Sequence, residues 1–193
     1  MRVSWNELND RIGQCRQCPL CEGATRKVPG QGNPDARLML IGEGPGYHED
    51  QSGLAFVGNA GQLLTRMLGS IGLTREEVYI CNVVKCRPPN NRTPLPEESE
   101  KCLPFLRMQF ALVRPQVILL LGATAGRYTL GESFRVTRDR GKPVLKNGVW
   151  FMPTYHPSAL LHDESKKRDA WHDLKAVREL LDSLPLKNGE VQP

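Results

Sequence analysis

Residues 38–46 read LMLIGEGPG, an apolar run that stops at Gly42 and continues as Glu-Gly-Pro-Gly. Glycine lets the backbone approach a ligand closely and Pro45 stiffens the loop, so the stretch predicts a ligand-facing turn after a buried strand. Neither familiar phosphate loop fits, because no Gly-Lys-Ser/Thr follows and the last glycine of a dinucleotide loop would fall on Tyr47. An ordinary strand-to-helix turn is the alternative interpretation.

Apolar runs bounded by turn residues recur along the chain, and helical patterns lie between them. The runs that predict buried strands are 36–42, 78–84, 116–122 and 149–154. The patterns that predict helices are 59–69, 96–113, 122–130 and 166–183. In the last helix we expect one apolar stripe to face the core, formed by Trp171, Leu174, Val177 and Leu181. Alternating strands and helices predict an α/β fold, with a mostly parallel sheet and helices on both faces.

Length and composition point to one globular domain that spans residues 1–193. Hydrophobic residues make up 39% of the chain and charged residues 24%, and no apolar run approaches the roughly 20 residues of a membrane span. The first ten residues, MRVSWNELND, lack the apolar stretch of a signal peptide. We therefore expect no membrane association, and a reducing cytoplasm as the compartment of the cysteines.

The basic residues are concentrated in or beside predicted loops. The net charge is +5, and three basic segments are 85–92, 135–146 and 166–168. This distribution is typical of a nucleic-acid footprint, in which Arg138 and Arg140 are candidate contacts. A set of solvated loops explains the same pattern without a ligand.

Three polar side chains follow predicted strands at the points where those strands end. Glu43 follows the first strand, Asn82 lies at the end of the second, and His156 follows the fourth. Ligands of open parallel sheets bind outside the carboxyl ends of the strands. We therefore expect these three side chains to converge on one crevice.

Six cysteines occupy positions 15, 18, 21, 81, 86 and 102. The Cys15-x2-Cys18 spacing is typical of metal ligands, and Cys86 and Cys102 could complete a set of four thiolates. Such a set fits a tetrahedral zinc ion or a [4Fe–4S] cluster, and the wide gap between Cys86 and Cys102 favours the cluster. Cys81 lies within an apolar strand, where a thiol acts as a small hydrophobe. We predict that Cys21 is not a ligand.

Five segments stand out, in order along nearly the whole chain: CRQCPL (15–20), GEGPGYHEDQSGLAFVGNAGQLL (42–64), YICNVVKCRPPNNRTPLPEE (79–98), KCLPFL (101–106) and PTYHPSALL (153–161). Together they resemble the corresponding segments of family 4 uracil-DNA glycosylases, the iron–sulfur members of the uracil-DNA glycosylase superfamily. The resemblance implies the three-layer α/β/α fold of these enzymes, with a central four-stranded parallel sheet. It also implies a cluster subregion of about 15–21 and 86–102, with ligands Cys15, Cys18, Cys86 and Cys102.

The resemblance implies a repair enzyme that flips uracil out of DNA, cuts its N-glycosidic bond and leaves an abasic site. Gly42 and Gly44 would let the backbone approach the base, and Glu43 would orient water beside the sugar C1′. Phe56 would stack on uracil, although a core phenylalanine is the alternative. Asn82 would donate to uracil O4 and accept from N3–H, a pattern that rejects cytosine.

The second motif that the resemblance assigns is HPS, at residues 156–158. His156 would donate to uracil O2 as the base departs, and Ser158 would contact a phosphate. Leu160 would enter the duplex as a wedge, although it could equally belong to the core. Glu49 would be the steric gate against the thymine methyl group, and the neighbouring Asp50 is the less favoured candidate for this role.

Two other functions account for part of the same sequence. A non-catalytic nucleic-acid-binding module with a structural metal would use the basic loops and the cysteines. An electron carrier of ferredoxin type would use the cysteines, although it would need two complete cysteine runs. Only the glycosylase requires Glu43, Asn82 and His156 to converge. We expect it to act as a monomer on single- or double-stranded uracil-containing DNA.

Overall fold

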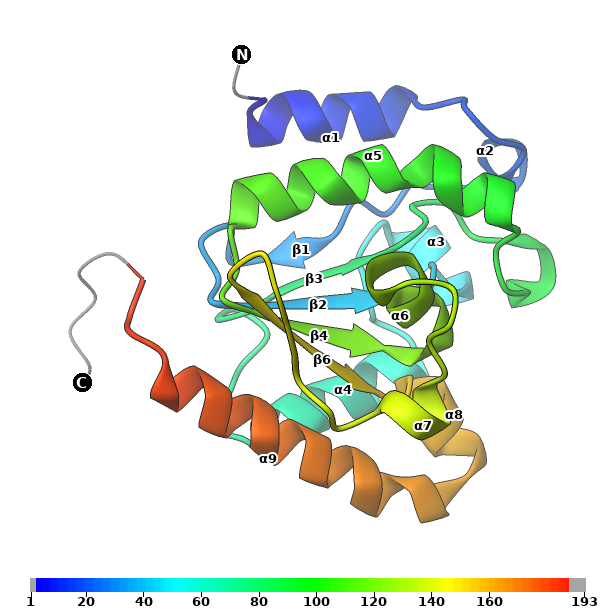
Figure 1. Cartoon of the computed structure of the whole chain (residues 1–193). Helices are drawn as coiled ribbons and strands as arrows, with labels where there is room; N and C mark the ends of the chain where they lie inside the picture. Colours follow the sequence, from blue (N-terminus) through cyan, green and yellow to red (C-terminus); the bar gives the residue numbers. More distant parts are fainter. Residues whose placement is uncertain (1–2, 188–193) are drawn as a thin grey trace.

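A computed structural model describes residues 3–187, which form a sheet between two layers of helices (Figure 1). Four parallel strands form the centre of the sheet: β2 (Leu38–Gly42), β3 (Tyr79–Asn82), β4 (Val117–Leu121) and β6 (Val149–Thr154). Two short antiparallel strands pair at its edges: β1 (Gln31–Gly32) and β5 (Val144–Lys146). The strand order is β1-β3-β2-β4-β6-β5. The α/β class and the four parallel strands are confirmed, and the two edge strands enlarge the expected sheet to six.

The central strands are buried on both faces, as their continuous apolar sequences predict. In β2, Leu38 and Leu40 belong to one hydrophobic cluster, whereas Met39 and Ile41 belong to the other. This alternation follows the two-residue period of a strand. Each face of the sheet therefore carries its own core.

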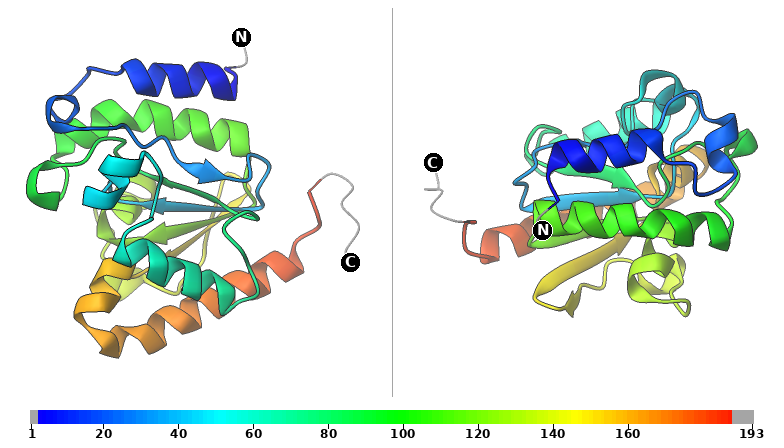
Figure 2. Two further views of the ribbon diagram at one scale, coloured as in Figure 1. Left: turned by 180° about the vertical axis from the view of Figure 1, so that it is seen from behind. Right: turned by 90° about the horizontal axis from the view of Figure 1, so that it is seen from above.

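Two pairs of helices cover the faces of the sheet (Figures 1 and 2). One layer holds α1 (Trp5–Gln14) and α5 (Pro96–Val113), which run side by side in the right-hand view of Figure 2. The other layer holds α4 (Asn59–Gly69) and α9 (Lys167–Ser183). No helix within residues 3–187 combines the length and apolarity needed to cross a membrane.

The remaining helical segments are short and, with one exception, have fewer than eight residues. The longer one is α6 (Gly122–Leu130), which follows β4 directly. The short ones are α2 (Leu20–Gly23), α3 (Tyr47–Ser52), η1 (Pro89–Asn91), α7 (Val136–Asp139), α8 (Pro157–His162) and η2 (Glu164–Lys166). In Figure 1, the arrowheads of β2 and β4 point toward the end of the sheet where α3, α6 and α8 lie. Four predicted helices match α4, α5, α6 and α9, the last of which begins one residue later than expected.

The apolar face of α9 differs from the predicted one at a single position. Trp171 is 45% exposed, and its ring lies 3.8 Å from the ammonium of Lys175. Ala170 is buried in its place, and the spacing from Ala170 to Leu174 and Val177 keeps these three residues on one face. The prediction that Trp171 faces the core is therefore wrong. Ala170 and Trp171 are consecutive residues of α9, and only the smaller one lies on the buried face.

Candidate active site

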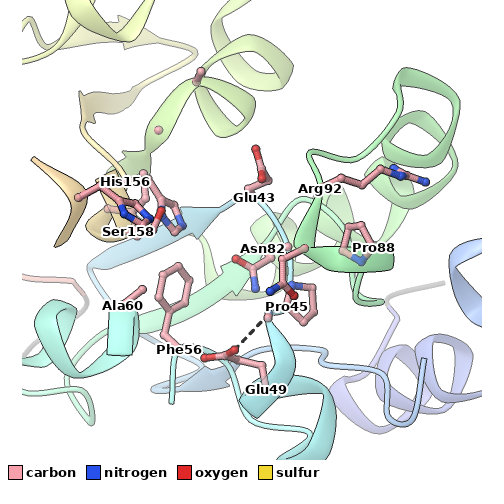
Figure 3. Close-up of a pocket in the computed structure, with 17 residues that line it drawn as sticks. Glu43, Pro45, Glu49, Phe56, Ala60, Asn82, Pro88, Arg92, His156 and Ser158 are labelled. Carbon is pink, nitrogen blue, oxygen red and sulfur yellow. Dashed lines mark hydrogen bonds between the residues drawn. The ribbon is translucent and has the colours of Figure 1, made fainter. Parts of the chain in front are cut away.

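A cavity of about 440 Å³ opens at the carboxyl ends of the parallel strands (Figure 3). Glu43, Asn82 and His156 all line it, so the predicted convergence is confirmed. The strand register explains the meeting of the first two, because Gly42 of β2 pairs with Asn82 of β3. Phe56 and Glu49 line the same cavity from the segment between β2 and α4.

Two glycines of the GEGPG stretch, residues 42–46, make room for neighbouring side chains. A Cβ on Gly42 would lie 2.4 Å from Oδ1 of Asn82 and 2.5 Å from Cζ of Phe56. A Cβ on Gly44 would lie 2.7 Å from a methyl group of Val84. The predicted close approach at these glycines is therefore made by the protein's own side chains, and Gly44 also lines the cavity.

Asn82 presents an unpaired acceptor at the cavity. Its side chain is 1% exposed, and Oδ1 has no hydrogen-bond partner among the described residues. Its backbone carbonyl accepts from Nζ of Lys85 at 2.5 Å, and the same ammonium donates to Oε1 of Gln109 at 2.7 Å. A buried acceptor without a partner is costly, so Oδ1 suits a ligand that carries an N–H donor.

Glu49 joins the two loops that form one wall of the cavity. Its carboxylate accepts from the backbone N–H groups of Gly46 at 3.1 Å, Val57 at 2.8 Å and Gly58 at 2.8 Å. The bond to Gly46 is drawn in Figure 3. The neighbouring Phe56 has a φ of 54°, a conformation that side-chain-bearing residues adopt at a cost. Glu49 therefore stabilises a strained turn, a structural role that the sequence did not reveal.

The ring of Phe56 lies beside the imidazole of His156. The ring centroids are 5.7 Å apart and the planes are tilted by 35°. A Cβ on Gly61 would lie 1.8 Å from the carbonyl oxygen of Phe56, so only glycine fits at this point of α4. Phe56 is 6% exposed and belongs to one hydrophobic cluster, yet it also lines the cavity.

His156 precedes α8, and its hydrogen bonds fix its tautomer. Nδ1 accepts from the backbone N–H of Ser158 at 3.2 Å, so this nitrogen carries no hydrogen. The hydroxyl of Ser158 also lies 2.7 Å from Nδ1 and is the donor of that contact. The imidazole proton is therefore on Nε2. Burial lowers the pKa of His156 to about 4, although the charge of Glu49 acts in the opposite direction.

The side chain of Ser158 contacts His156, and its predicted contact with a DNA phosphate stays a prediction. Its hydroxyl is directed at the imidazole of His156, whereas the sequence reading assigned it to a phosphate. The reason is local, because a serine two residues after a helix-capping histidine can reach the ring nitrogen. In this structure Ser158 orients His156.

We expect His156 to stay neutral over the whole physiological pH range. In nitrogen-15 NMR spectra of the protein, Nε2 should carry the proton, and the ring should not titrate until the pH falls to about 4. A His156 ring that titrates near pH 6.5 would contradict the assignment.

The model of the Uracil DNA glycosylase superfamily matches residues 29–180, which include every cavity residue described above. The chain belongs to this superfamily. It is 48% identical to a type-4 uracil-DNA glycosylase of Thermotoga maritima, over 83% of this chain and 84% of the relative. It is 43% identical to one of Archaeoglobus fulgidus, over 92% and 93%. A type-5 uracil-DNA glycosylase of Pyrobaculum aerophilum is 35% identical, over 70% and 67%.

Two predicted DNA contacts of this superfamily member need correction. Leu160 is 1% exposed and packs in the core, so it is not available to enter a duplex, whereas the next residue, Leu161, is 42% exposed. Arg140 donates to the buried carboxylate of Asp173 at 2.6 Å and also pairs with Asp169, so its guanidinium is held against α9 with 18% of its side chain exposed. Leu160 is turned toward the hydrophobic cluster beneath α8, and Arg140, which directly follows α7, is turned toward α9. Arg138 is exposed, as a DNA contact requires, and pairs with its neighbour Asp139.

A second, smaller cavity gathers five of the six cysteines between α1, α2 and α5. The cysteines that line this cavity are Cys15, Cys18, Cys21, Cys86 and Cys102. Cys81 lies apart from it, fully buried on β3 in the hydrophobic cluster that includes α1 and α5. The meeting of the two chain segments 15–21 and 86–102 is therefore confirmed.

The donor set of this cavity consists of thiols, which are the ligands of zinc ions and of iron–sulfur clusters. Within residues 3–187, no three His, Cys, Asp or Glu side chains lie close enough together to hold one metal ion. Burial, and then the neighbouring thiols of Cys102, Cys18 and Cys15, raise the pKa of Cys86 to about 12. Thiols gathered around one small cavity are the donors that a metal centre requires.

Two residues of the basic segment 85–92 have roles at the site that the sequence analysis did not predict. Lys85 was counted with a basic loop, yet it is 1% exposed beneath Asn82. Arg92 lines the active-site cavity, and its guanidinium donates to both carboxylate oxygens of the buried Glu98, at 2.8 and 2.6 Å. The placement of Lys85 directly after the apolar pair Val83-Val84 is the one local hint of its burial.

Proposed function

We propose that this chain is a uracil-DNA glycosylase that excises uracil from DNA and leaves an abasic site for base excision repair. The observation that carries the proposal is the buried Oδ1 of Asn82, an acceptor without a hydrogen-bond partner in residues 3–187, at a cavity lined by Phe56 and His156. The type-4 names of the relatives support the same activity. A base that enters this cavity meets an N–H acceptor, an aromatic wall and an N–H donor.

Recognition of uracil follows from the polarity of its edge. Oδ1 of Asn82 accepts from N3–H of uracil, and the amide NH₂ of the same side chain donates to O4. Cytosine has an acceptor at N3 and a donor at N4, so both contacts are lost and buried polar groups stay unpaired. Sites of this kind discriminate by roughly 10⁴-fold. Glu49, held by three backbone N–H groups, is the rigid wall that excludes the thymine methyl group.

Chemistry requires stabilisation of the departing base and delivery of water to the sugar. Nε2–H of the neutral His156 donates to uracil O2, where negative charge develops as the glycosidic bond breaks. The carboxylate of Glu43 orients the attacking water and stabilises positive charge on the deoxyribose. Ser158 keeps His156 in the tautomer that this step needs.

Contact with DNA uses the basic residues around the mouth of the cavity. Arg87 lies 5.1 Å from the ring of Tyr47, which is 54% exposed beside the cavity loop. Arg92 at the cavity and Arg138 on α7 provide two further guanidinium groups, each of which forms an ion pair with a carboxylate, that of Glu98 or Asp139. We propose a single-domain monomer that works on chromosomal DNA in the cytoplasm.

The four thiols Cys15, Cys18, Cys86 and Cys102 would hold a [4Fe–4S] cluster. When bound, the cluster supplies a covalent link between the N-terminal segment and the loop that begins at Cys86. That loop continues to Pro88, Asn91 and Arg92, which line the active-site cavity. The cysteines therefore stabilise one wall of the site through the chain itself.

A uracil-containing oligonucleotide tests the proposed activity. Incubation with the protein, followed by alkali and a sizing gel, should cut the strand at uracil and leave the matched cytosine and thymine strands intact. Chromatography of the same reaction should recover one free uracil per cut. A bound but uncut oligonucleotide would favour the non-catalytic binding module.

The substitution Asn82→Asp should change base choice. It keeps the size of the side chain but removes the NH₂ donor that faces uracil O4. We expect uracil excision to fall by about 100-fold or more, and slow cytosine excision to appear. Single-turnover rates on uracil and cytosine strands measure both effects. An Asn82→Asp enzyme with unchanged uracil excision would remove Asn82 from base recognition.

A further inference from the structure

The first turn of α6 touches both proposed catalytic residues. The hydroxyl of Thr124 donates a hydrogen bond to Oε2 of Glu43, across 81 positions of sequence. At the start of the same helix, a Cβ on Gly122 would lie 2.9 Å from Cβ of His156, so the backbone of α6 packs directly against the second motif. Neither contact was expected from the sequence, because α6 carries no motif of its own.

The position of α6 is itself fixed. A Cβ on Gly126 would lie 2.1 Å from the ring of Phe134, so the helix lies flat on that buried ring. Thr124 is 7% exposed, and its hydroxyl is directed at the carboxylate rather than at the solvent. The helix α6 therefore directs the hydroxyl of Thr124 at the side chain of Glu43, which belongs to the loop after β2.

This contact determines how Glu43 can act. A glutamate side chain rotates about three bonds, and ordering such a side chain costs conformational entropy. Within the described residues, Thr124 is the one group hydrogen-bonded to the carboxylate of Glu43. It occupies Oε2 and leaves Oε1 for a water molecule in the cavity that Glu43 lines. The hydroxyl thus selects one orientation of the carboxylate.

We propose that Thr124 is a positioning residue for catalysis, which holds the carboxylate of Glu43 in the orientation that delivers water to the sugar. The inference rests on the proposed function, in which Glu43 orients that water. Thr124 does not touch the base, so its loss affects the chemical step and leaves recognition of uracil intact.

The test compares Thr124→Val, which keeps the shape and removes the hydroxyl, with Thr124→Ser, which keeps the hydroxyl. Under single-turnover conditions Thr124→Val should excise uracil roughly 10- to 100-fold more slowly, the effect of a lost hydrogen bond to a charged group. Thr124→Ser should stay within about 3-fold of the wild type, and the dissociation constant for uracil-containing DNA should not change. Thr124→Ala must show the same loss as Thr124→Val, which guards against misfolding of either variant. A Thr124→Val enzyme with the wild-type rate would overturn the proposal.

A double-mutant cycle separates positioning from general support of the fold. If Thr124 acts through Glu43, Thr124→Val should slow a Glu43→Ala enzyme by less than about 3-fold, because its partner is already absent. An equal slowing in both backgrounds would overturn the inference while leaving the proposed function in place. A Glu43→Ala enzyme with the wild-type rate would instead remove Glu43 from the mechanism, and the inference with it.

Discussion

His156→Ala should slow the excision of uracil by roughly 100- to 1,000-fold, because it removes a fixed donor to the charge that develops on the base. The structure gives the reason for so large an effect. The imidazole is already neutral, and Ser158 already directs its proton to Nε2, so no reorganisation precedes the reaction. Single-turnover rates with saturating enzyme measure the loss, and the preference for uracil over cytosine should be unchanged.

His162 provides the matched control for this substitution. It lines the same cavity from the end of α8, but it is exposed and lies outside the proposed chemistry. We expect His162→Ala to retain the rate within about 3-fold. Should His156→Ala cleave at the wild-type rate while its affinity for DNA falls, His156 would be a binding residue and the mechanism would fail.

Cys102→Ser should abolish cluster binding and loosen the N-terminal layer. We expect iron to fall from about four atoms per chain to nearly none, because a cubane needs all four thiolates for stable binding. The melting temperature should fall by more than about 10 °C, since metal binding and local folding are coupled. Anaerobic purification, iron analysis and circular dichroism measure these effects.

Cys21→Ser is the control, because Cys21 lines the same small cavity but lies outside the proposed ligand set. It should keep the brown colour and the full iron content. Loss of iron from Cys21→Ser together with full iron in Cys102→Ser would reassign the ligands. A colourless wild-type protein that holds one zinc ion would contradict the cluster altogether.

The regular part of the fold was predictable because it depends on local patterns. The central strands are continuous apolar runs between turn residues, and β4 is 0–1% exposed along its whole length. The edge strands escaped prediction for the opposite reason, because β1 has two residues and every residue of β5 is exposed. Short solvent-exposed strands carry no burial pattern for the sequence to show.

The candidate site was predictable where the chain topology determines which residues meet. It was unpredictable where the direction of a single side chain determines its role. Glu43, Asn82 and His156 converge because parallel strands end at the same edge of the sheet. Ser158 and Leu160 were assigned to DNA from their motif, but the side chains face His156 and the core. The direction of Leu160 depends on how α8 packs against the hydrophobic core, which the motif does not record, whereas Ser158 contacts a ring only two residues before it in the sequence.

A crystal structure with a duplex that carries a hydrolysis-resistant 2′-fluorinated deoxyuridine is the most direct test of the account. The flipped base should lie against Phe56, with its N3 about 2.7–3.2 Å from Oδ1 of Asn82 and its O2 at a similar distance from Nε2 of His156. Uracil that remains stacked in the duplex, or that enters the cavity with N3 turned away from Asn82, would contradict it.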